Sequence, residues 1–317
     1  MNLSDVSQEI LRTPASELLN TPEVPSAEPT TSGVEIKFSD QLRAYYLQDQ
    51  RAMYSRWNPS PRPSFNAGLL TDINAYHNFL AGSNAQIECD GKQHPLEYVV
   101  LASDKPGVFN LGGDLDLFKK LIGEQDRAEL LRYGRACIEV LYANYTAFGL
   151  PVSTISLVQG DALGGGFEAA LSSDLIVAEK SARFGFPEIL FNLFPGMGAY
   201  SFLDRRIGQR ATEDLIGSGQ IFSAQQMFEK GVIDSVVEDG QGEAGVAALI
   251  NKRKRSQNGF VGLARTRRRV HKIEFSELLD VVEIWVDSAL RLNVRDLKLM
   301  QRLVSRQNGL GESVQVH

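Results

Sequence analysis

The sequence predicts an α/β fold in which helices cover a mainly parallel sheet. Short apolar runs bounded by turns, which are typical of buried strands, alternate along the chain with longer segments of helical period. Strands separated by helices indicate βα units, and such units pair their strands in parallel. With 317 residues, 43% of them apolar, the chain is long enough to bury a sizeable core.

The first half of the chain predicts strands and one amphipathic helix. Residues 34–38, VEIKF, have the character of a strand, whereas residues 45–57 are compatible with either a strand or a helix. Apolar residues in the segment 69–80 recur at helical spacing and predict an amphipathic helix. His77 lies off that apolar stripe, so we expect it at the surface. Residues 98–103, YVVLAS, form a short apolar run bounded by a turn and predict a buried strand.

The second half alternates strands and helices around three consecutive glycines. A helical pattern extends from about residue 115 to 148, and a buried strand, STISLVQG at 153–160, leads into the glycines. The remaining predicted elements are a helix at 168–173, a strand at 175–180, a candidate strand that includes Phe184 and Phe186, helices at 199–218 and 224–230, a short strand at 232–239, and helical segments without strand character from 242 to 304.

These patterns divide the chain into three parts. Residues 1–33 end in a segment rich in Pro, Ser, Thr and Glu that can bury little apolar surface, so we expect a flexible N-terminal extension. A docking segment for a partner is the alternative interpretation. Residues 34–241 form the predicted core and residues 242–317 a C-terminal helical region. In that region, residues 278–292 place Trp285 and other apolar residues on one helix face, which must cover something apolar.

Composition and charge exclude several classes of protein. The formal net charge of −6 argues against nucleic acid as a partner, because binding to a phosphate backbone requires a basic surface. The two cysteines cannot form a disulfide framework, and the N-terminal residues lack the features of a signal peptide, so we expect a cytoplasmic protein. The longest apolar runs are far shorter than the roughly 18 residues that indicate a membrane span, so we expect no membrane association.

Two basic stretches stand out from this acidic background. They are KRKR at 252–255 and RTRRR at 265–269. A solvated helix face explains them most simply. The alternative is a docking surface for an acidic carrier protein or for the phosphate-bearing arm of a thioester, which an otherwise acidic protein would need.

The stretch 158–198, VQGDALGGGFEAALSSDLIVAEKSARFGFPEILFNLFPGMG, holds the features most typical of an active site. It places two glutamates, Glu168 and Glu188, in mostly apolar surroundings. Three glycines precede the first glutamate and leave the backbone unshielded by side chains. A reacting group can therefore approach this backbone closely at Gly164, Gly165 and Gly166.

Glycine turns that lead into helices predict an oxyanion hole. Such a turn leaves backbone N–H groups unpaired at the helix start, with the positive end of the helix dipole behind them. The loop at 107–115, GVFNLGGDL, has the same order of strand, glycines and helix, so it offers a second backbone donor. Two donors directed at one point bind a thioester or ester carbonyl; plain turn chemistry is the alternative for either loop alone. The predicted substrate-binding glycines are Gly112, Gly113, Gly164 and Gly166.

Both glutamates are candidate acid/base residues. Glu168 falls in the first turn of its predicted helix, where a carboxylate also interacts favourably with the dipole, so an ordinary helix charge is the alternative. Its apolar neighbours suggest burial, and a buried carboxyl without an ion-pair partner has a raised pKa, which suits proton transfer near neutral pH. Glu188 is likewise a charge in an apolar run. If both reach one ligand, one can remove a proton while the other delivers one.

Other common chemistries find no support in the sequence. The glycines lack the GxGxxG spacing of a dinucleotide site, and there is no phosphate-binding GxxxxGK[ST]. No GxSxG nucleophile elbow is present, and the cysteines lack a local catalytic motif. The four histidines are scattered and suggest no metal site. We therefore predict proton-transfer chemistry beside an activated carbonyl, without a metal or redox cofactor.

The sequence resembles the crotonase, or enoyl-CoA hydratase/isomerase, superfamily. The resemblance covers about residues 98–239 and rests on FNLGGDL, QGDALGGGFEAAL, FGFPEILFNLFPGMGAY and FSAQQMFEKGVIDSVV. Within the superfamily, the chain is most similar to the diffusible signal factor (DSF) synthases of bacterial quorum sensing. The stretches VLASDKPGVFNLGGDLDLF, GGGFEAAL, LFPGMGAYSF and EIWVDSAL support this narrower match, which extends to about residue 292.

The resemblance implies a fold, an assembly and a set of site residues. The fold is a crotonase-type spiral of repeated ββα units with a C-terminal helical region, and the assembly is a homotrimer, sometimes paired into a hexamer. The backbone N–H groups that hold the thioester oxygen fall on Leu111 and Gly165. The acid/base carboxyls of hydratases fall on Glu168 and Glu188, and both are present. Trp285 becomes a candidate wall of the acyl tunnel, with ordinary core packing as the alternative.

For the synthase branch, the resemblance implies a lyase with thioesterase activity and no cofactor. The implied reaction dehydrates a 3-hydroxyacyl thioester on acyl carrier protein to a cis-2-enoyl thioester and hydrolyses it to the free acid. The implied partners are acyl carrier protein or CoA as the substrate carrier and the receiver domain of a sensor kinase as a regulator. The alternatives are an ordinary enoyl-CoA hydratase or isomerase of fatty acid metabolism, and a non-catalytic module that binds a signalling partner.

Overall fold

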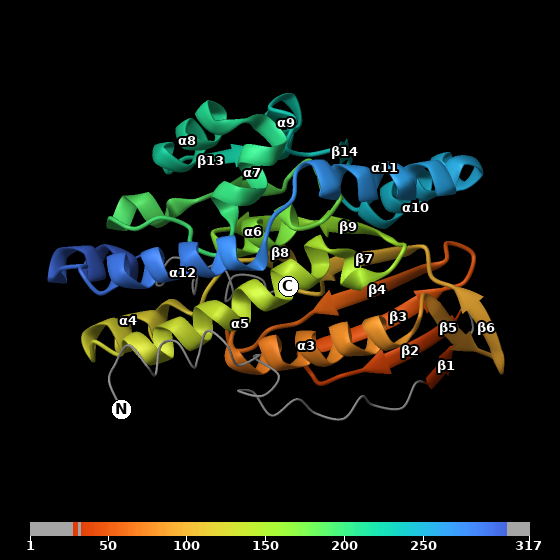
Figure 1. Cartoon of the computed structure of the whole chain (residues 1–317), viewed down its shortest axis with the longest axis horizontal. Coiled ribbons are helices and arrows are strands. Elements are labelled where there is room, and N and C mark those ends of the chain that lie inside the picture. Colours follow the sequence, from red (N-terminus) through yellow and green to blue (C-terminus); the bar gives the residue numbers. More distant parts are fainter. Residues whose placement is uncertain (1–27, 31–32, 303–317) are drawn as a thin grey trace.

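The structure, a computed structural model, describes residues 28–30 and 33–302 and is centred on an eight-stranded sheet (Figure 1). The strand order is β1-β2-β3-β4-β7-β9-β11-β14. The pairs from β1 to β4 are antiparallel, and every pair from β4 to β14 is parallel. The strands are β1 (Glu28–Thr30), β2 (Gly33–Lys37), β3 (Leu42–Leu47), β4 (Ala52–Trp57), β7 (Tyr98–Ser103), β9 (Ser153–Val158), β11 (Leu175–Glu179) and β14 (Ser235–Val237).

A second, four-stranded sheet has the order β13-β12-β10-β8. Consecutive strands alternate between the sheets: β7, β9 and β11 belong to the large sheet, and β8, β10 and β12 to the small one. Helical residues follow each of the successive pairs β7–β8, β9–β10 and β11–β12. The predicted spiral of ββα units is thus confirmed. The strands of the small sheet are β8 (Gly107–Asn110), β10 (Gly160–Leu163), β12 (Arg183–Gly185) and β13 (Ile221–Ser223), and β5 (Gln86–Cys89) and β6 (Lys92–Pro95) form a separate hairpin.

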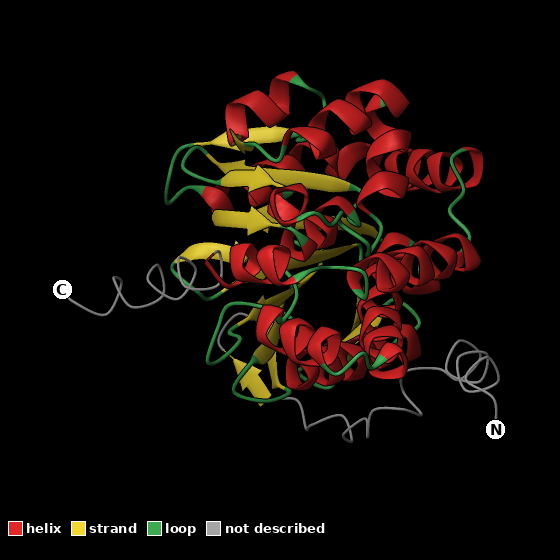
Figure 2. Ribbon diagram, turned by 90° about the vertical axis from the view of Figure 1, so that its left-hand side faces the viewer, coloured by secondary structure: helices red, strands yellow, loops and turns green. Residues whose placement is uncertain are grey.

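Most helices gather on one side of the strands, as Figure 2 shows. A large apolar core fills the space between these helices and the sheets, and a smaller core on the other face of the large sheet is covered by α10. The helices are α3 (Ala67–Gly82), α4 (Leu115–Gly123), α5 (Arg127–Tyr145), α6 (Gly165–Leu171), α7 (Ala199–Ile207), α8 (Gln209–Ser218), α9 (Ala224–Glu229), α10 (Gly242–Arg253), α11 (Gln257–Val270) and α12 (Phe275–Ala289). Short 3-10 turns are η1 (Ala147–Gly149), η2 (Pro187–Phe191) and η3 (Lys254–Ser256).

The structure settles one ambiguous segment and divides one predicted helical stretch. Residues 45–47 and 52–57 are strand, in the antiparallel pair β3–β4, and residues 48–51 form the turn between them. The helical pattern at 115–148 is divided into α4 and α5 at Gln125, whose φ of 55° no helix can accommodate. The side chain of Asp126 then caps α5 by accepting a hydrogen bond from the Glu129 N–H at 3.0 Å.

The strand predicted at 153–160 ends earlier than expected. β9 stops at Val158, and Gly160 begins a separate strand, β10, which the sequence pattern did not reveal. β10 pairs with β8 so closely that a Cβ on Gly160 would lie 2.1 Å from the carbonyl carbon of Gly107. Only glycine permits this approach of two backbones. The three glycines therefore follow a strand of the small sheet.

The prediction of an exposed His77 is wrong. The residue is buried, and its ring centroid lies 4.9 Å from that of Phe148. Helix α5 and η1 pack against α3 in addition to β3, so the part of α3 that carries His77 is covered as well. Burial lowers the pKa of His77 to about 3, so the imidazole is neutral and part of the core.

The predicted N-terminal extension needs a correction at its end. Residues Glu28–Thr30 form β1 and pair antiparallel with Gly33–Glu35 of β2, so they belong to the edge of the large sheet. Residues 1–27 and 31–32 lie outside the described part of the chain. The division between a core and a C-terminal region at residue 241 stays a prediction; α10 begins at Gly242.

One of the two basic stretches attaches α11 to the rest of the molecule. Arg267 and Arg268 both form ion pairs with the buried carboxylate of Asp174, the first at 2.6 Å. Arg265 and Arg269 are exposed on the same helix. The stretch at 265–269 is therefore in part structural and in part a solvated face.

The helices offer no candidate for a membrane span. Within residues 28–30 and 33–302, no helix is both long enough and apolar enough to cross a bilayer.

Candidate active site

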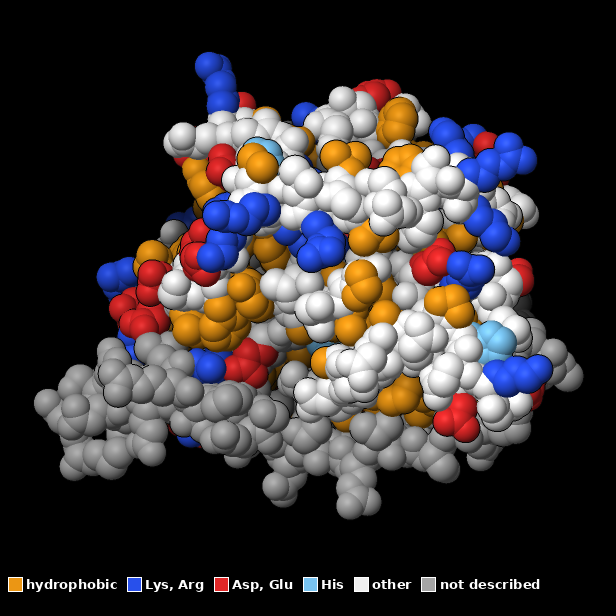
Figure 3. All heavy atoms as spheres, turned by 45° about the vertical axis from the view of Figure 1, so that its right-hand side comes forward, with side chains coloured by type: hydrophobic (Ala, Val, Ile, Leu, Met, Phe, Trp, Pro, Cys, Tyr) orange, Lys and Arg blue, Asp and Glu red, His pale blue; other side chains and the backbone are white. Residues whose placement is uncertain are grey.

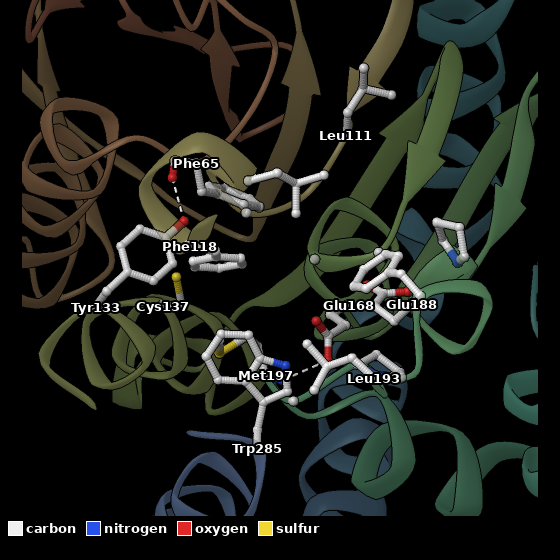
Figure 4. A pocket seen from close by; sticks show the side chains of 18 of the residues that line it. Phe65, Leu111, Phe118, Tyr133, Cys137, Glu168, Glu188, Leu193, Met197 and Trp285 are labelled. Carbon is white, nitrogen blue, oxygen red and sulfur yellow. Dashed lines mark hydrogen bonds between the residues drawn. The ribbon is translucent and has the colours of Figure 1, made fainter. Parts of the chain in front are cut away.

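A largely apolar cavity of about 50 Å³ lies where the loops after β8 and β10 meet α4, α5, α6 and α12 (Figure 4). Figure 4 shows Glu168 and Glu188 beside each other, with Tyr133, Phe118 and Trp285 across the cavity. The structure thus brings together both predicted acid/base residues and both predicted glycine loops. The lining residues are Phe65, Leu111, Gly113, Leu115, Phe118, Tyr133, Cys137, Leu141, Gly164, Gly165, Glu168, Pro187, Glu188, Phe191, Leu193, Pro195, Gly196, Met197 and Trp285.

Glu168 is held in the cavity by backbone donors at the start of α7. Its side chain is buried, and Oε1 accepts hydrogen bonds from the N–H of Met197 at 2.8 Å and of Ala199 at 2.9 Å. Ala199 is the first residue of α7, so the helix dipole also favours a negative charge there. Burial nevertheless dominates and raises the pKa of Glu168 from 4.5 to about 7, against the opposing effect of the two hydrogen bonds.

The surroundings of Glu188 stabilise a negative charge on its carboxyl much less than those of Glu168 do. It lies in η2, and its Oε2 is buried without a hydrogen-bond partner among the residues that the structure describes. Burial, followed by repulsion from the charge of Glu168, raises the pKa of Glu188 from 4.5 to about 8. The two N–H groups that bind Glu168 make it the more readily ionised of the two carboxyls, and Glu188, whose Oε2 has no partner among the described residues, is the one that holds a proton more readily.

A single proton shared by two neighbouring carboxyls supplies an acid and a base at one place. Two buried carboxylates close to each other repel when both are charged, so they release their protons in separate steps. Between those steps, one carboxyl can accept a proton while the other donates one. Proton transfer at two adjacent atoms of a ligand is the chemistry that this arrangement serves best.

Gly164 is required by the position of Glu188. Its φ of 52° and ψ of −127° are strained for any other residue, and a Cβ would lie 2.5 Å from Oε1 of Glu188. The N–H of Gly164 donates to the carbonyl oxygen of Gly185 at 2.9 Å, which joins the glycine turn to β12. The first of the three glycines thus makes room for the carboxyl group of Glu188.

Gly165 and Gly166 allow the two glycine loops to touch. A Cβ on Gly166 would lie 1.9 Å from the carbonyl oxygen of Asn110, and one on Gly165 would lie 3.2 Å from the Cα of Gly112. Gly165 is the first residue of α6, and the first N–H groups of a helix have no intrahelical acceptor. Its N–H therefore remains a candidate oxyanion donor, as predicted.

The structure does not support Leu111 as the second donor. The N–H of Leu111 already donates to the carbonyl oxygen of Pro63 at 2.8 Å, so it is not free to bind a substrate. Leu111 still lines the cavity. Within the predicted loop, the sequence pattern pointed to an amide that already has an acceptor.

Gly113 offers a candidate amide instead, since its N–H has no acceptor within residues 28–30 and 33–302. The N–H of Phe65 donates to the carbonyl oxygen of Gly112 at 2.8 Å. Because a trans peptide is planar, the carbonyl of Gly112 and the N–H of Gly113 point in opposite directions, so this bond turns the Gly113 N–H away from Phe65. The Gly113 nitrogen also lies 3.5 Å from the position that a Cβ would take on Gly165. The N–H groups of Gly113 and Gly165 are thus neighbours at the cavity.

Trp285 packs in the core and also lines the cavity. Its indole is almost fully buried, lies 5.0 Å from the ring of Phe118, and packs on Gly196 so closely that a Cβ there would be 2.3 Å from the indole. It also lines the cavity from α12. The C-terminal helical region therefore closes one side of the site.

Sequence reasoning missed the residues that α5 contributes. Tyr133, Cys137 and Leu141 all line the cavity and follow one another at intervals of four residues, so they occupy one face of the helix. This spacing was visible in the sequence, but it is equally typical of core packing. Burial raises the pKa of the Cys137 thiol to about 12, which argues against a nucleophilic cysteine.

The cavity shows no set of side chains suited to a metal ion. Across the described residues, no three His, Cys, Asp or Glu side chains lie close enough together to hold one.

Several known proteins are similar to this chain. A family model described as enoyl-CoA hydratase/isomerase matches residues 83–261, more than half of the chain. The mitochondrial methylglutaconyl-CoA hydratase of Mus musculus is 27% identical over 215 residues, an alignment that covers 65% of this chain and 62% of the relative. The corresponding protein of Rattus norvegicus is also 27% identical, with 61% of its length covered. The chain thus spans less than two thirds of these curated relatives.

Solved structures share the fold. The enoyl-CoA hydratase from Bacillus halodurans has a TM-score of 0.68 and 20% identity, and the match covers 83% of this chain and 100% of that one. Pseudomonas aeruginosa DspI has a TM-score of 0.60 and 21% identity, and the match covers 74% of this chain and 88% of that one. Human mitochondrial delta3-delta2-enoyl-CoA isomerase has a TM-score of 0.65 and 18% identity, with 84% and 97% covered. At these identities the likeness establishes the fold.

The raised pKa of Glu188 predicts a pH-dependent gain in stability for Glu188→Gln. Between pH 4.5 and about 8, the folded protein retains a proton that the unfolded chain has released, so the wild type loses stability as the pH rises. Glutamine has no such proton. The variant should be more stable than the wild type by on the order of 1–3 kcal/mol at pH 8, the cost of a buried unpaired group, and by little at pH 4.5.

Urea denaturation at pH 5, 6.5 and 8 measures this difference. Glu88→Gln, an exposed glutamate on β5, is the matched control and should show no such trend. A stability difference for Glu188→Gln that does not change with pH would contradict the assignment.

Proposed function

The chain belongs to the enoyl-CoA hydratase/isomerase family, and from this we propose that it catalyses proton transfer at C2 and C3 of an acyl thioester, as the addition or elimination of water. The observation that supports the proposal most strongly is the pair of buried carboxyls, with pKa values of about 7 and 8, beside the amides of Gly113 and Gly165. Two buried acids without ion-pair partners weaken a fold. Their presence favours a chemical role over a structural one.

The two amides activate the substrate. When both N–H groups bind the thioester oxygen, they stabilise the negative charge that this oxygen gains as C2 exchanges its proton. Loss of one such donor costs about 2.7–4 kcal/mol of transition-state stabilisation in other enzymes. Because the surrounding fold holds both backbone donors in place before the substrate binds, they require no reorganisation during the reaction.

The protonation states assign roles in the direction of hydration. Glu168, the more readily ionised carboxyl, removes a proton from water as the oxygen of the water bonds to C3. The electron pair of the C2–C3 double bond then takes the proton of Glu188 at C2. Dehydration follows the reverse course: Glu188 takes the C2 proton, and Glu168 protonates the hydroxyl that leaves C3 as water.

We further propose that the chain is a DSF-type synthase. In this reaction a 3-hydroxyacyl thioester on acyl carrier protein is dehydrated to a cis-2-enoyl thioester. Water then attacks the carbonyl carbon, a glutamate takes the proton of the water, and the other glutamate protonates the departing thiolate. The support is the sequence similarity across residues 98–292 together with the apolar cavity walls from α4, α5 and α12, which suit an acyl chain.

An ordinary enoyl-CoA hydratase or isomerase is the second candidate. The family model and the similarity to methylglutaconyl-CoA hydratase favour it, because both point to CoA thioesters. The two candidates share the carboxyl pair and the oxyanion hole, and they differ in the substrate carrier and in the hydrolysis step. A non-catalytic module gains little support, because such a module has no need of two buried acids.

The proposed partners follow from the same similarity. We propose that the protein acts in the cytoplasm as a homotrimer or a pair of trimers, with the receiver domain of a sensor kinase as a regulatory partner. Helix α11 supports an assembly of this kind: it has no buried residue, and Leu263 and Val270 are exposed at 64% and 70%. An apolar helix face of this kind favours contact with another chain.

Glutamine substitutions at the two glutamates test the proposed chemistry. Glu168→Gln and Glu188→Gln should each lower the rate of hydration of a medium-chain trans-2-enoyl-CoA by about 10²- to 10⁴-fold, because each removes one proton-transfer group. Glu88→Gln should retain full activity. Unchanged activity in either glutamine variant would contradict the assigned roles.

The choice of substrate then separates the two candidates. Release of free cis-2-enoic acid from 3-hydroxyacyl carrier protein, detected by mass spectrometry, would establish the synthase. Reversible hydration of 2-enoyl-CoA without any free acid would establish the ordinary hydratase. If the wild type acts on neither substrate, the proposed function is wrong.

The position of Trp285 predicts a change in chain-length preference. Trp285→Leu enlarges the side of the cavity formed by α12, so the ratio of kcat/KM for longer over shorter acyl chains should rise about 10-fold or more. Val286→Ala removes a buried side chain from the same helix that does not line the cavity, and it should leave this ratio unchanged. An unchanged ratio in Trp285→Leu would show that Trp285 does not limit the acyl chain.

A further inference from the structure

The loop that offers the Gly113 N–H has little stiffness of its own. Residues 111–114 join β8 to α4 and include two adjacent glycines, of which Gly112 has a φ of 92°. Glycine allows many backbone conformations, so a chain with two of them holds an amide in one direction only when its neighbours fix it. An oxyanion donor needs that fixed direction, because misplacement by about 1 Å can cost 10²-fold in rate.

The segment Pro63–Phe65 fixes one side of the loop. The N–H of Leu111 donates to the carbonyl oxygen of Pro63, and the N–H of Phe65 donates to the carbonyl oxygen of Gly112, both at 2.8 Å. The second bond sets the plane of the peptide that ends in the Gly113 N–H. The direction of the proposed donor therefore depends on the position of Phe65.

The hydroxyl of Tyr133 connects this segment to the far end of the loop. It donates a hydrogen bond to the carbonyl oxygen of Phe65 and accepts one from the N–H of Asp114 at 3.2 Å. One hydroxyl thus holds the residue that orients the Gly112–Gly113 peptide and the residue directly after Gly113. Tyr133 itself is buried on α5, where the ring of Phe118 packs edge-on at 5.1 Å.

We propose that Tyr133 is a positioning residue for the oxyanion hole: its hydroxyl holds the Gly113 N–H in the direction that the thioester oxygen requires. The proposal rests on the proposed function for its effect on rate, but the effect on the loop itself does not depend on the reaction. The structure assigns Tyr133 no direct part in proton transfer, because its one proton is committed to the carbonyl oxygen of Phe65. Burial also raises the pKa of Tyr133 well above its ordinary value.

Tyr133→Phe isolates the hydroxyl. The ring that lines the cavity stays, so KM should change by less than about threefold, whereas kcat should fall by about 10- to 100-fold as the Gly113 amide loses its fixed direction. The pH profile should stay the same, because Glu168 and Glu188 are unaffected. The substrate is whichever thioester the wild type converts.

Tyr46→Phe is the matched control. Tyr46 is also buried, and its hydroxyl donates to a backbone carbonyl, that of Pro95, at 2.8 Å, away from the cavity. Tyr46→Phe should lower the free energy of unfolding by a similar amount but retain the kcat of the wild type. If Tyr133→Phe keeps the kcat of the wild type, or if Tyr46→Phe loses as much, the proposal is overturned.

Hydrogen–deuterium exchange of the ligand-free protein tests the loop without any substrate. Peptides that cover residues 107–118 should exchange faster in Tyr133→Phe than in the wild type and in Tyr46→Phe, while peptides from β9 should not change. Unchanged exchange at 107–118 would overturn the proposal. A wild type without thioester activity would instead refute the proposed function, and the exchange result would still decide the role of Tyr133.

Discussion

The burial of two adjacent carboxyls is the constraint on which the rest of the site depends. Glu168 is stabilised by two backbone N–H groups, whereas Glu188 has a buried oxygen with no hydrogen-bond partner in the described part of the chain. Neighbouring carboxyls in such surroundings cannot both be charged at low cost, so they hold one proton between them near neutral pH. This state, with an acid and a base a short distance apart, exists only because the fold places both side chains in one cavity.

Several backbone features serve to place the pair. Gly164 has no side chain in the space that the carboxyl of Glu188 occupies. The first residue of α7, Ala199, donates its N–H to Glu168. Gly166 allows α6 to rest directly on the loop after β8. These contacts bring β8, β10 and η2 together, so the two amides and the two carboxyls converge from different ββα units. The large core and α12 close the other side of the cavity.

The sequence pattern identified two carboxyls that share one cavity, but it pointed to the amide of Leu111, which already has an acceptor. Glu168 and Glu188 were visible because charges are rare in apolar runs, and the glycines were visible because they precede a helix. The choice between Leu111 and Gly113 depends on Pro63 and Phe65, which lie almost fifty residues earlier in the chain and pair with the loop only in the fold. The prediction of an exposed His77 was wrong for the same reason, because η1 and α5 cover a part of α3 that the local sequence pattern leaves open. Contacts distant in sequence therefore decide the details that local spacing leaves undetermined.

Titration of the two carboxyls by NMR, with 13C in the side-chain carboxyls of glutamate, tests the central claim most directly. Two resonances should titrate with apparent pKa values near 7 and 8 in the wild type. One resonance should disappear in Glu168→Gln and the other in Glu188→Gln. In Glu168→Gln, the remaining group should titrate at lower pH than in the wild type, because it no longer faces a neighbouring charge. If every glutamate titrates near 4.5, the carboxyls are not the buried, proton-sharing pair that this account requires.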